Sequence, residues 1–192
     1  MKRAMSVLTA VSTAALLVLL AGSASAKTCE DITMPNSVTV DGVKLVLNGM
    51  GVREATVFNV NVYVAGLYVE AKSSSAGPIL DAEGPRQLVL RFVRDVDKAD
   101  IVEAFTEGFG HSGVAGLGPR IKQLVAMVPD AKDGATWTFT YTKDKGVEVK
   151  IGSSVKGAVE GADFFKAFLN IWLGSKPPNK GLKRGLLGGE CG

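Results

Sequence analysis

The stretch of sequence that decides the fold runs from Asn48 to Glu70 and reads NGMGVREATVFNVNVYVAGLYVE. Its many valines and aromatic residues suit a pleated, largely buried surface better than a helix, so we expect two strands joined by a tight connection. If the connection centres near Phe58, residues at equal distances before and after Phe58 lie opposite each other. Arg53 and Tyr63 are such a pair, and their Cβ atoms should be roughly 4.5–5.5 Å apart.

Arg53 and Tyr63 are also the first candidates for function. A planar guanidinium can bind two oxygens, and a neighbouring phenol adds a third donor, so the pair would suit a carboxylate or a phenolate. The alternative is an ordinary edge-strand arginine in water beside a tyrosine that keeps its hydroxyl at the surface. The residues alone leave both interpretations open.

The N-terminal segment has the features of a secretory signal. Two basic residues precede the apolar run Ser6–Leu20, and Ala24-Ser25-Ala26 is a small-residue cleavage site. A single-pass membrane anchor is the alternative, but the apolar run is short for a span and no basic flank follows it. We therefore expect a signal peptide over residues 1–26, a single domain over residues 27–192, and export to the periplasm or the medium.

The two cysteines, Cys29 and Cys191, lie near opposite ends of the expected mature chain. In an oxidising compartment they read most simply as one disulfide that ties the termini together, and closing so long a loop could contribute about 4–5 kcal/mol. Unpaired thiols or an intermolecular link are the alternatives. No CxxC motif or metal-ligand spacing supports another role.

The charge pattern argues against a nucleic-acid partner. The chain has 22 basic and 19 acidic residues, and the basic ones are dispersed rather than interleaved with aromatic residues. The densest basic cluster, Lys180–Arg184, is expected on the exposed side of a terminal helix. We expect no stable membrane span once the signal is removed, and the sequence names no protein partner.

Hydrophobic periodicity predicts strands first and then helices mixed with strands. Asp41-Gly42 suits a two-residue hairpin turn, Asp97 is a suitable helix N-cap, and Ser73–Pro78 reads as a loop. We expect strands at residues 37–40, 43–47, 53–58, 60–70, 87–93, 137–141 and 147–151. We expect helices over about residues 98–109, through 121–128, through 164–172 and over 180–187. These elements define an α+β fold, a large antiparallel sheet with helices on one face, and an apolar cleft between the layers is the natural ligand site.

Two further motifs carry little weight. Gly108, Gly110 and Gly113 in GFGHSG match the dinucleotide fingerprint by letter, but the match comes at the end of a predicted helix instead of between a strand and a helix. His111 is the only histidine, and no cysteine or second histidine stands at ligand spacing from it. We therefore expect neither a cofactor nor a metal.

Three blocks of the sequence resemble the chalcone isomerase superfamily, most closely its bacterial exported chalcone isomerase-like members. They are GVREATVFNVNVYVAGLYVE (51–70), RFVRDVDKADIVEAFTEGF (91–109) and AVEGADFFKAFLNIWLGSKPPNKGLKRGLLG (158–188). The resemblance implies an open-faced β-sandwich with helices layered on a large antiparallel sheet. Members of the superfamily include enzymes that close a chalcone into a flavanone, fatty-acid-binding proteins, and relatives with no demonstrated reaction.

The resemblance assigns roles to individual residues. Arg53 matches the arginine that holds the substrate oxyanion in the enzymes and the carboxylate in the fatty-acid binders. Tyr63 stands where the enzymes have a threonine and resembles the fatty-acid-binding branch. The enzymes also use a tyrosine, a lysine and an asparagine, but the matching region here offers Asp97, Asp100 and Ala104.

A hydroxyl residue of the enzymes is likewise replaced, here by Ile171. The resemblance thus implies an exported, non-catalytic protein that binds a lipophilic, fatty-acid-like carboxylate. Its ligand-binding residues would be Arg53 and Tyr63 with the aromatic side chains of Phe105, Phe109, Phe168 and Trp172, for which ordinary core packing is the alternative. The alternatives for function are an isomerase or lyase acting on a phenolic or enone substrate through Arg53, and a structural or partner-binding protein without a ligand.

Overall fold

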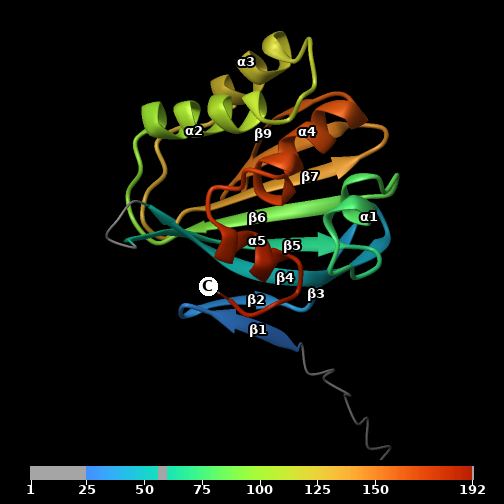
Figure 1. Ribbon diagram of the computed structural model, residues 1–192, viewed down its shortest axis with the longest axis vertical. Coiled ribbons are helices and arrows are strands. Elements are labelled where there is room, and N and C mark those ends of the chain that lie inside the picture. The colour runs from blue at the N-terminus through green and yellow to red at the C-terminus, as the bar shows by residue number, and fades with distance from the viewer. Residues whose placement is uncertain (1–24, 56–59, 192) are drawn as a thin grey trace, which may run out of the picture.

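A computed structural model describes residues 25–55 and 60–191 of the chain. Its centre is one antiparallel sheet in which each strand pairs with the next along the chain, in the order β3-β4-β5-β6-β7-β8-β9 (Figure 1). The strands are β3 (Ser37–Val40), β4 (Val43–Ala55), β5 (Val60–Val69), β6 (Arg86–Phe92), β7 (Thr136–Thr142), β8 (Gly146–Ile151) and β9 (Ser154–Val159). The predicted α+β class and antiparallel sheet are confirmed, while β9 had not been predicted.

The long strands β4 and β5 pair in the expected register, with Arg53 opposite Tyr63. The register shifts directly after this pair, where Glu54 lies opposite Asn61. Such a bulge bends the strand and changes the direction of neighbouring side chains. The connection that we placed near Phe58 lies outside the described residues.

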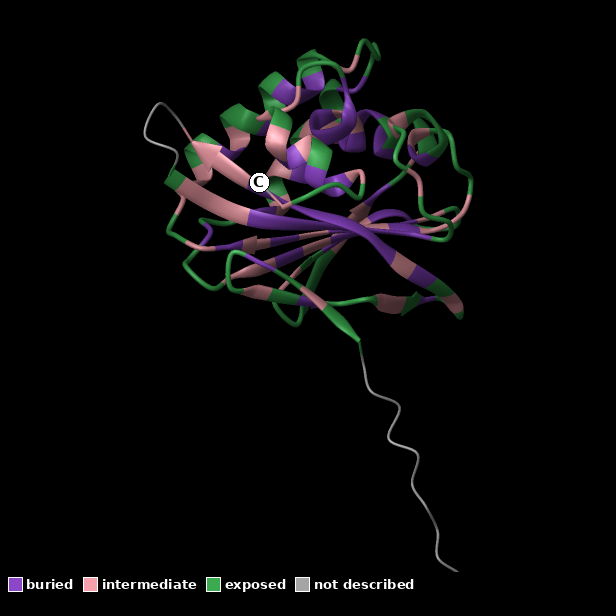
Figure 2. Cartoon of the chain, turned by 60° about the horizontal axis from the view of Figure 1, so that its bottom comes forward, coloured by how far each residue is buried: buried purple, intermediate pink, exposed green. Residues whose placement is uncertain are grey.

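Helices cover one face of the sheet. They are α1 (Ala76–Leu80), α2 (Lys98–Gly110), α3 (Gly118–Met127), α4 (Ala162–Leu173) and α5 (Lys180–Leu186). The helix α4 lies deepest, because its broad aromatic face packs on the sheet: Phe165 stacks on Tyr141 with ring centroids 4.8 Å apart, and Phe168 lies 4.8 Å from Phe139. Figure 2 shows the buried residues concentrated in the sheet and on the sides of the helices that face it.

One local prediction on this face was wrong, and a second was confirmed only in part. Part of the segment Ser73–Pro78, expected as a loop, begins the five-residue helix α1. Asp97 occupies the N-cap position of α2 as expected, but its side chain makes no capping hydrogen bond. The carboxylate of Asp130 instead accepts a hydrogen bond of 2.9 Å from the Lys98 N–H, because a tertiary neighbour can satisfy a free helical N–H as well as the local residue can.

A short hairpin that had not been predicted covers the opposite face of the sheet. It consists of β1 (Ala26–Cys29) and β2 (Ile32–Pro35), which pair with each other and not with the main sheet. Met34 packs beneath β5, where Gly66 leaves room for its sulfur, and Tyr68 donates a hydrogen bond of 2.9 Å to the Pro35 carbonyl. The sheet therefore has a second apolar core on this side.

A disulfide joins Cys29 of this hairpin to Cys191, with the two Cα atoms 5.8 Å apart. The expected pairing is therefore present in the structure. The proposed signal peptide lies almost wholly outside the described residues and remains a prediction.

The helix α5 lies directly on β4, backbone against backbone. A Cβ atom on Gly51 would come within 2.9 Å of the Leu182 Cα, and one on Gly185 within 2.9 Å of the Gly51 Cα, so glycines make this approach possible. The buried Asn48 fixes the far end of the helix by donating a 2.7 Å hydrogen bond to the Leu186 carbonyl. The chain direction of α5 is thus opposite to that of β4, with residue 182 beside residue 51 and residue 186 beside residue 48.

Candidate functional site

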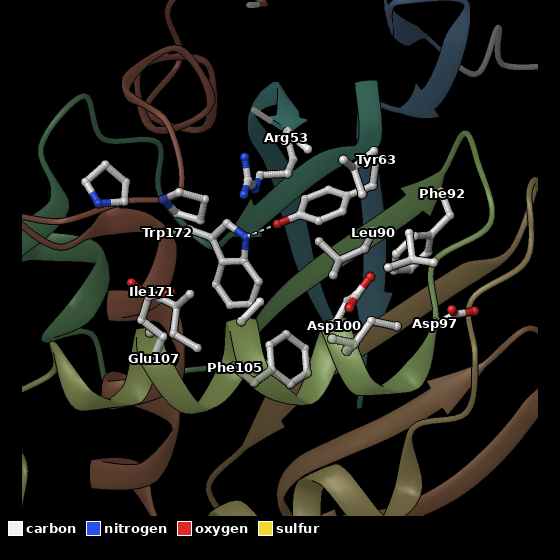
Figure 3. A pocket seen from close by; sticks show the side chains of 18 of the residues that line it. Arg53, Tyr63, Leu90, Phe92, Asp97, Asp100, Phe105, Glu107, Ile171 and Trp172 are labelled. Atoms are coloured by element: carbon white, nitrogen blue, oxygen red, sulfur yellow. Dashed lines mark hydrogen bonds between the residues drawn. The ribbon is translucent and has the colours of Figure 1, made fainter. Parts of the chain in front are cut away.

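A cleft of about 780 Å³ opens between the sheet, the helix α2 and the segment that joins α4 to α5 (Figure 3). A volume of this size suits a small-molecule ligand. The sheet contributes the end of β4 and residues of β5 and β6, and the joining segment contributes Lys176, Pro177 and Pro178. These last three residues had no role in the sequence interpretation, because only the tertiary fold brings them to the cleft.

Arg53, Tyr63 and Trp172 meet at one end of the cleft. Arg53 and Tyr63 come from neighbouring strands in the predicted cross-strand register, and Trp172 comes from the last turn of α4. The indole N–H of Trp172 donates a hydrogen bond of 2.9 Å to the Tyr63 hydroxyl. One Nη atom of Arg53 donates to the Glu54 carbonyl, directly at the bulge. A cavity therefore lies beside Arg53, and the role of Arg53 in ligand binding stays a prediction.

The protonation state of Tyr63 and its hydrogen bond with Trp172 determine whether the Tyr63 hydroxyl can donate to a ligand. Burial raises the pKa of Tyr63 to about 12, against the opposing effects of the Trp172 hydrogen bond and the charge of Arg53, so the phenol is neutral at physiological pH. An indole can only donate, so Tyr63 accepts in that contact and keeps its own proton. In the described part of the chain this hydroxyl makes no other hydrogen bond, and it can donate to a ligand oxygen.

The floor of the cleft is apolar. Phe92 lies edge-on to Tyr63 at 5.6 Å between ring centroids, and Phe105 lies 6.2 Å from Trp172. Leu90 and Ile101 are buried and also line the cleft. A guanidinium and a neutral hydroxyl therefore stand beside an apolar floor.

Two of the six predicted ligand-binding residues lie deeper than the cleft. Phe109 stacks on Phe164 at 5.2 Å, and Phe168 packs against Phe139 at 4.8 Å. Neither is among the described residues that line the cavity. Their positions favour the alternative, core packing, whereas Phe105 and Trp172 reach the cleft surface.

The rim of the cleft is polar and carries both signs of charge. Asp95 accepts hydrogen bonds from the Asp133 N–H at 2.8 Å and from Lys132 at 2.9 Å, and these contacts lower the pKa of its carboxyl. Asp100 points from α2 towards the cleft (Figure 3). The resemblance matched Asp100 to the region where the enzymes carry polar site residues, whereas no local signal marked Asp95 as a rim residue.

His111 is exposed at the rim, 3.8 Å from the Glu107 carboxylate. Within residues 25–55 and 60–191 no group of three or more histidine, cysteine, aspartate or glutamate side chains is placed to hold a metal ion. In the same residues no helix has the length and hydrophobicity needed to cross a membrane.

A helix-covered antiparallel sheet with a cleft between its layers, closed by an arginine and a tyrosine from adjacent strands, defines a protein of the chalcone isomerase fold. The chain belongs to the chalcone isomerase-like family, whose sequence pattern matches residues 26–188. A search of curated proteins found no match to the chain.

The fold also occurs among solved structures. The crystal structure of a fatty-acid-binding protein of Arabidopsis thaliana superimposes with a TM-score of 0.69 at 16% sequence identity. The match covers 85% of this chain and 96% of the plant protein. At this level of identity the similarity establishes the fold and not the ligand.

Proposed function

We propose that this protein is an exported, non-catalytic binder of a lipophilic carboxylate of the fatty-acid type. The observation that carries the proposal is the meeting of Arg53 with the neutral hydroxyl of Tyr63 beside the apolar floor of the cleft. The guanidinium supplies a charge-assisted hydrogen bond to one carboxylate oxygen, and the phenol donates to the other. The hydrocarbon tail would lie over Phe92 and Phe105.

The remaining cleft residues support binding over conversion. Asp97, Asp100, Ala104 and Ile171 all line the cleft at the positions where the enzymes carry polar positioning groups. Ionised carboxylates only accept hydrogen bonds, and alanine and isoleucine offer no side-chain donor, so none of the four can stabilise a developing enolate. An isomerase would need such differential stabilisation of its transition state.

The proposal of export rests on the N-terminal signal features and on the disulfide between Cys29 and Cys191. Disulfides persist in oxidising compartments and are rare in the cytosol. Fusion of residues 1–26 to a periplasmic reporter tests this part of the proposal, because a reporter retained in the cytosol would contradict it.

The test of binding is mass spectrometry of lipids extracted from the purified mature protein, followed by titration with palmitate. Arg53→Ala should lose the copurified lipid and bind palmitate about 10- to 100-fold more weakly, as expected for a lost charge-assisted contact. Arg91→Ala is the matched control, because Arg91 hydrogen-bonds Thr136 on the other face of the sheet. Absence of lipid from the wild type together with no palmitate binding, or equal binding by both variants, would overturn the proposal.

A further inference from the structure

The three alternate residues Gly49, Gly51 and Arg53 of β4 face the helix side of the sheet. The first two carry no side chain, and the backbone of α5 fills the space above them. On this face of the strand, Arg53 is the first residue after the two glycines that has a side chain. This side chain enters the cleft where α5 begins. The start of α5 is therefore the part of the helix nearest to the ligand-anchoring arginine.

The residue at that start is Asn179, the N-cap of α5. Its side chain does not cap the helix. The Nδ2 group instead donates to the Val52 carbonyl at 3.2 Å and lies 3.5 Å from a carboxylate oxygen of Glu54. Asn179 thus contacts both sequence neighbours of Arg53. The Oδ1 atom of Asn179 is buried without a partner among the described residues, so the amide acts here as a donor.

These contacts fall on one of the two irregular parts of β4. The register shifts between Arg53 and Glu54, and the Glu54 carbonyl accepts the hydrogen bond from the Arg53 guanidinium. A bulged strand end has lost part of its ladder, and its direction depends on other contacts. The amide of Asn179 supplies two such contacts, to the Val52 carbonyl and to the Glu54 carboxylate.

We propose that Asn179 is a positioning residue, which holds the bulged end of β4 so that the Arg53 guanidinium meets the ligand carboxylate beside Tyr63. This role rests on the proposed function, since it concerns the same anchor. Asn179 does not touch the ligand itself, because it is not among the described residues that line the cleft.

The test is a double-mutant cycle with two ligands of equal chain length, palmitate and hexadecanol. Asn179→Ala should weaken palmitate binding about 5- to 20-fold and leave hexadecanol binding within about twofold, because residues that act through one another are coupled. In an Arg53→Ala background the same change should have no further effect on palmitate. Asn179→Gln, which keeps the amide, should recover part of the affinity.

A readout without ligand separates this inference from the proposed function. The Nε–H signal of Arg53 in a ¹H–¹⁵N spectrum, identified by its loss in Arg53→Ala, should shift or broaden in Asn179→Ala. An unchanged signal, or equal losses of palmitate affinity in both backgrounds, would overturn the role of Asn179 while leaving carboxylate binding intact. Failure of the wild type to bind palmitate would instead overturn the proposed function, and the Arg53 signal would still decide whether Asn179 orients the arginine.

Discussion

Replacing Tyr63 by phenylalanine removes one oxygen and tests both roles of the Tyr63 hydroxyl, as acceptor from Trp172 and as donor to the ligand. Trp172 is only 1% exposed, and its indole N–H donates to that oxygen at 2.9 Å. In Tyr63→Phe this donor stays buried without an acceptor, which costs about 1–3 kcal/mol of folding free energy. For a chain of this size, each kcal/mol lowers the melting temperature by about 2–4 °C.

The same substitution removes the donor that we assign to the ligand. A hydrogen bond to a charged group contributes about 1.5–3 kcal/mol, so palmitate should bind about 10- to 150-fold more weakly. Hexadecanol has no charged head group, and its affinity should change far less. Urea unfolding measures the loss of stability, and fluorescence or calorimetric titration measures the two affinities.

Two results would refute this reasoning about Tyr63. Unchanged stability would mean that the Trp172 indole does not depend on the hydroxyl. A palmitate affinity within twofold of wild type would mean that the phenol is not a ligand donor. Tyr141→Phe is the control for loss of a phenol, because Tyr141 lies under Phe165 and away from the cleft.

Three further predictions concern stability. Replacing Cys29 and Cys191 by alanine should lower the free energy of unfolding by up to about 5 kcal/mol, because the bond closes a loop with a sequence separation of 162. Urea titrations measure this loss. A loss below about 1 kcal/mol would contradict the chain-entropy explanation of the disulfide's effect. Burial raises the pKa of Tyr68 to about 12. The contribution of its neutral phenol to the free energy of unfolding is therefore complete below about pH 10 and is lost between about pH 10 and 12. Tyr68→Phe should make the free energy of unfolding depend less on pH in that range. Gly51→Ala should destabilise by about 2 kcal/mol or more because its Cβ meets the backbone of α5, whereas Gly110→Ala, whose Cβ meets nothing within 4 Å, should be neutral or stabilising in thermal melts.

The sequence predicted the main sheet well where strands are long and turns carry a strong signal. The Asp41-Gly42 turn has the positive φ angles of a tight hairpin, 45° and 83°, and its glycine made the turn predictable from the sequence. The turn of the β1–β2 hairpin uses the same region of φ with Glu30 and Asp31, at 47° and 62°, and lacks the glycine that marks the first turn. β9 was missed because Gly157 interrupts its short apolar pattern.

Strand register made only one part of the candidate site predictable, the cross-strand pair of Arg53 and Tyr63. Arg53 and Tyr63 face each other because alternation and a tight connection fix their pairing. The hydrogen bond from Trp172 joins residues 109 positions apart, and no local pattern encodes it. Aromatic spacing on a helix likewise indicates a buried face but cannot separate Phe105, at the cleft, from Phe168, in the core.

The disulfide has a consequence for the order of events during synthesis. Cys191 lies 162 residues after Cys29, so its thiol becomes available only after all seven strands of the main sheet have been made. The bond therefore cannot guide the early pairing of strands. It can close only after the N-terminal hairpin and the segment after α5 have come into contact, so it stabilises a fold whose elements are already in place.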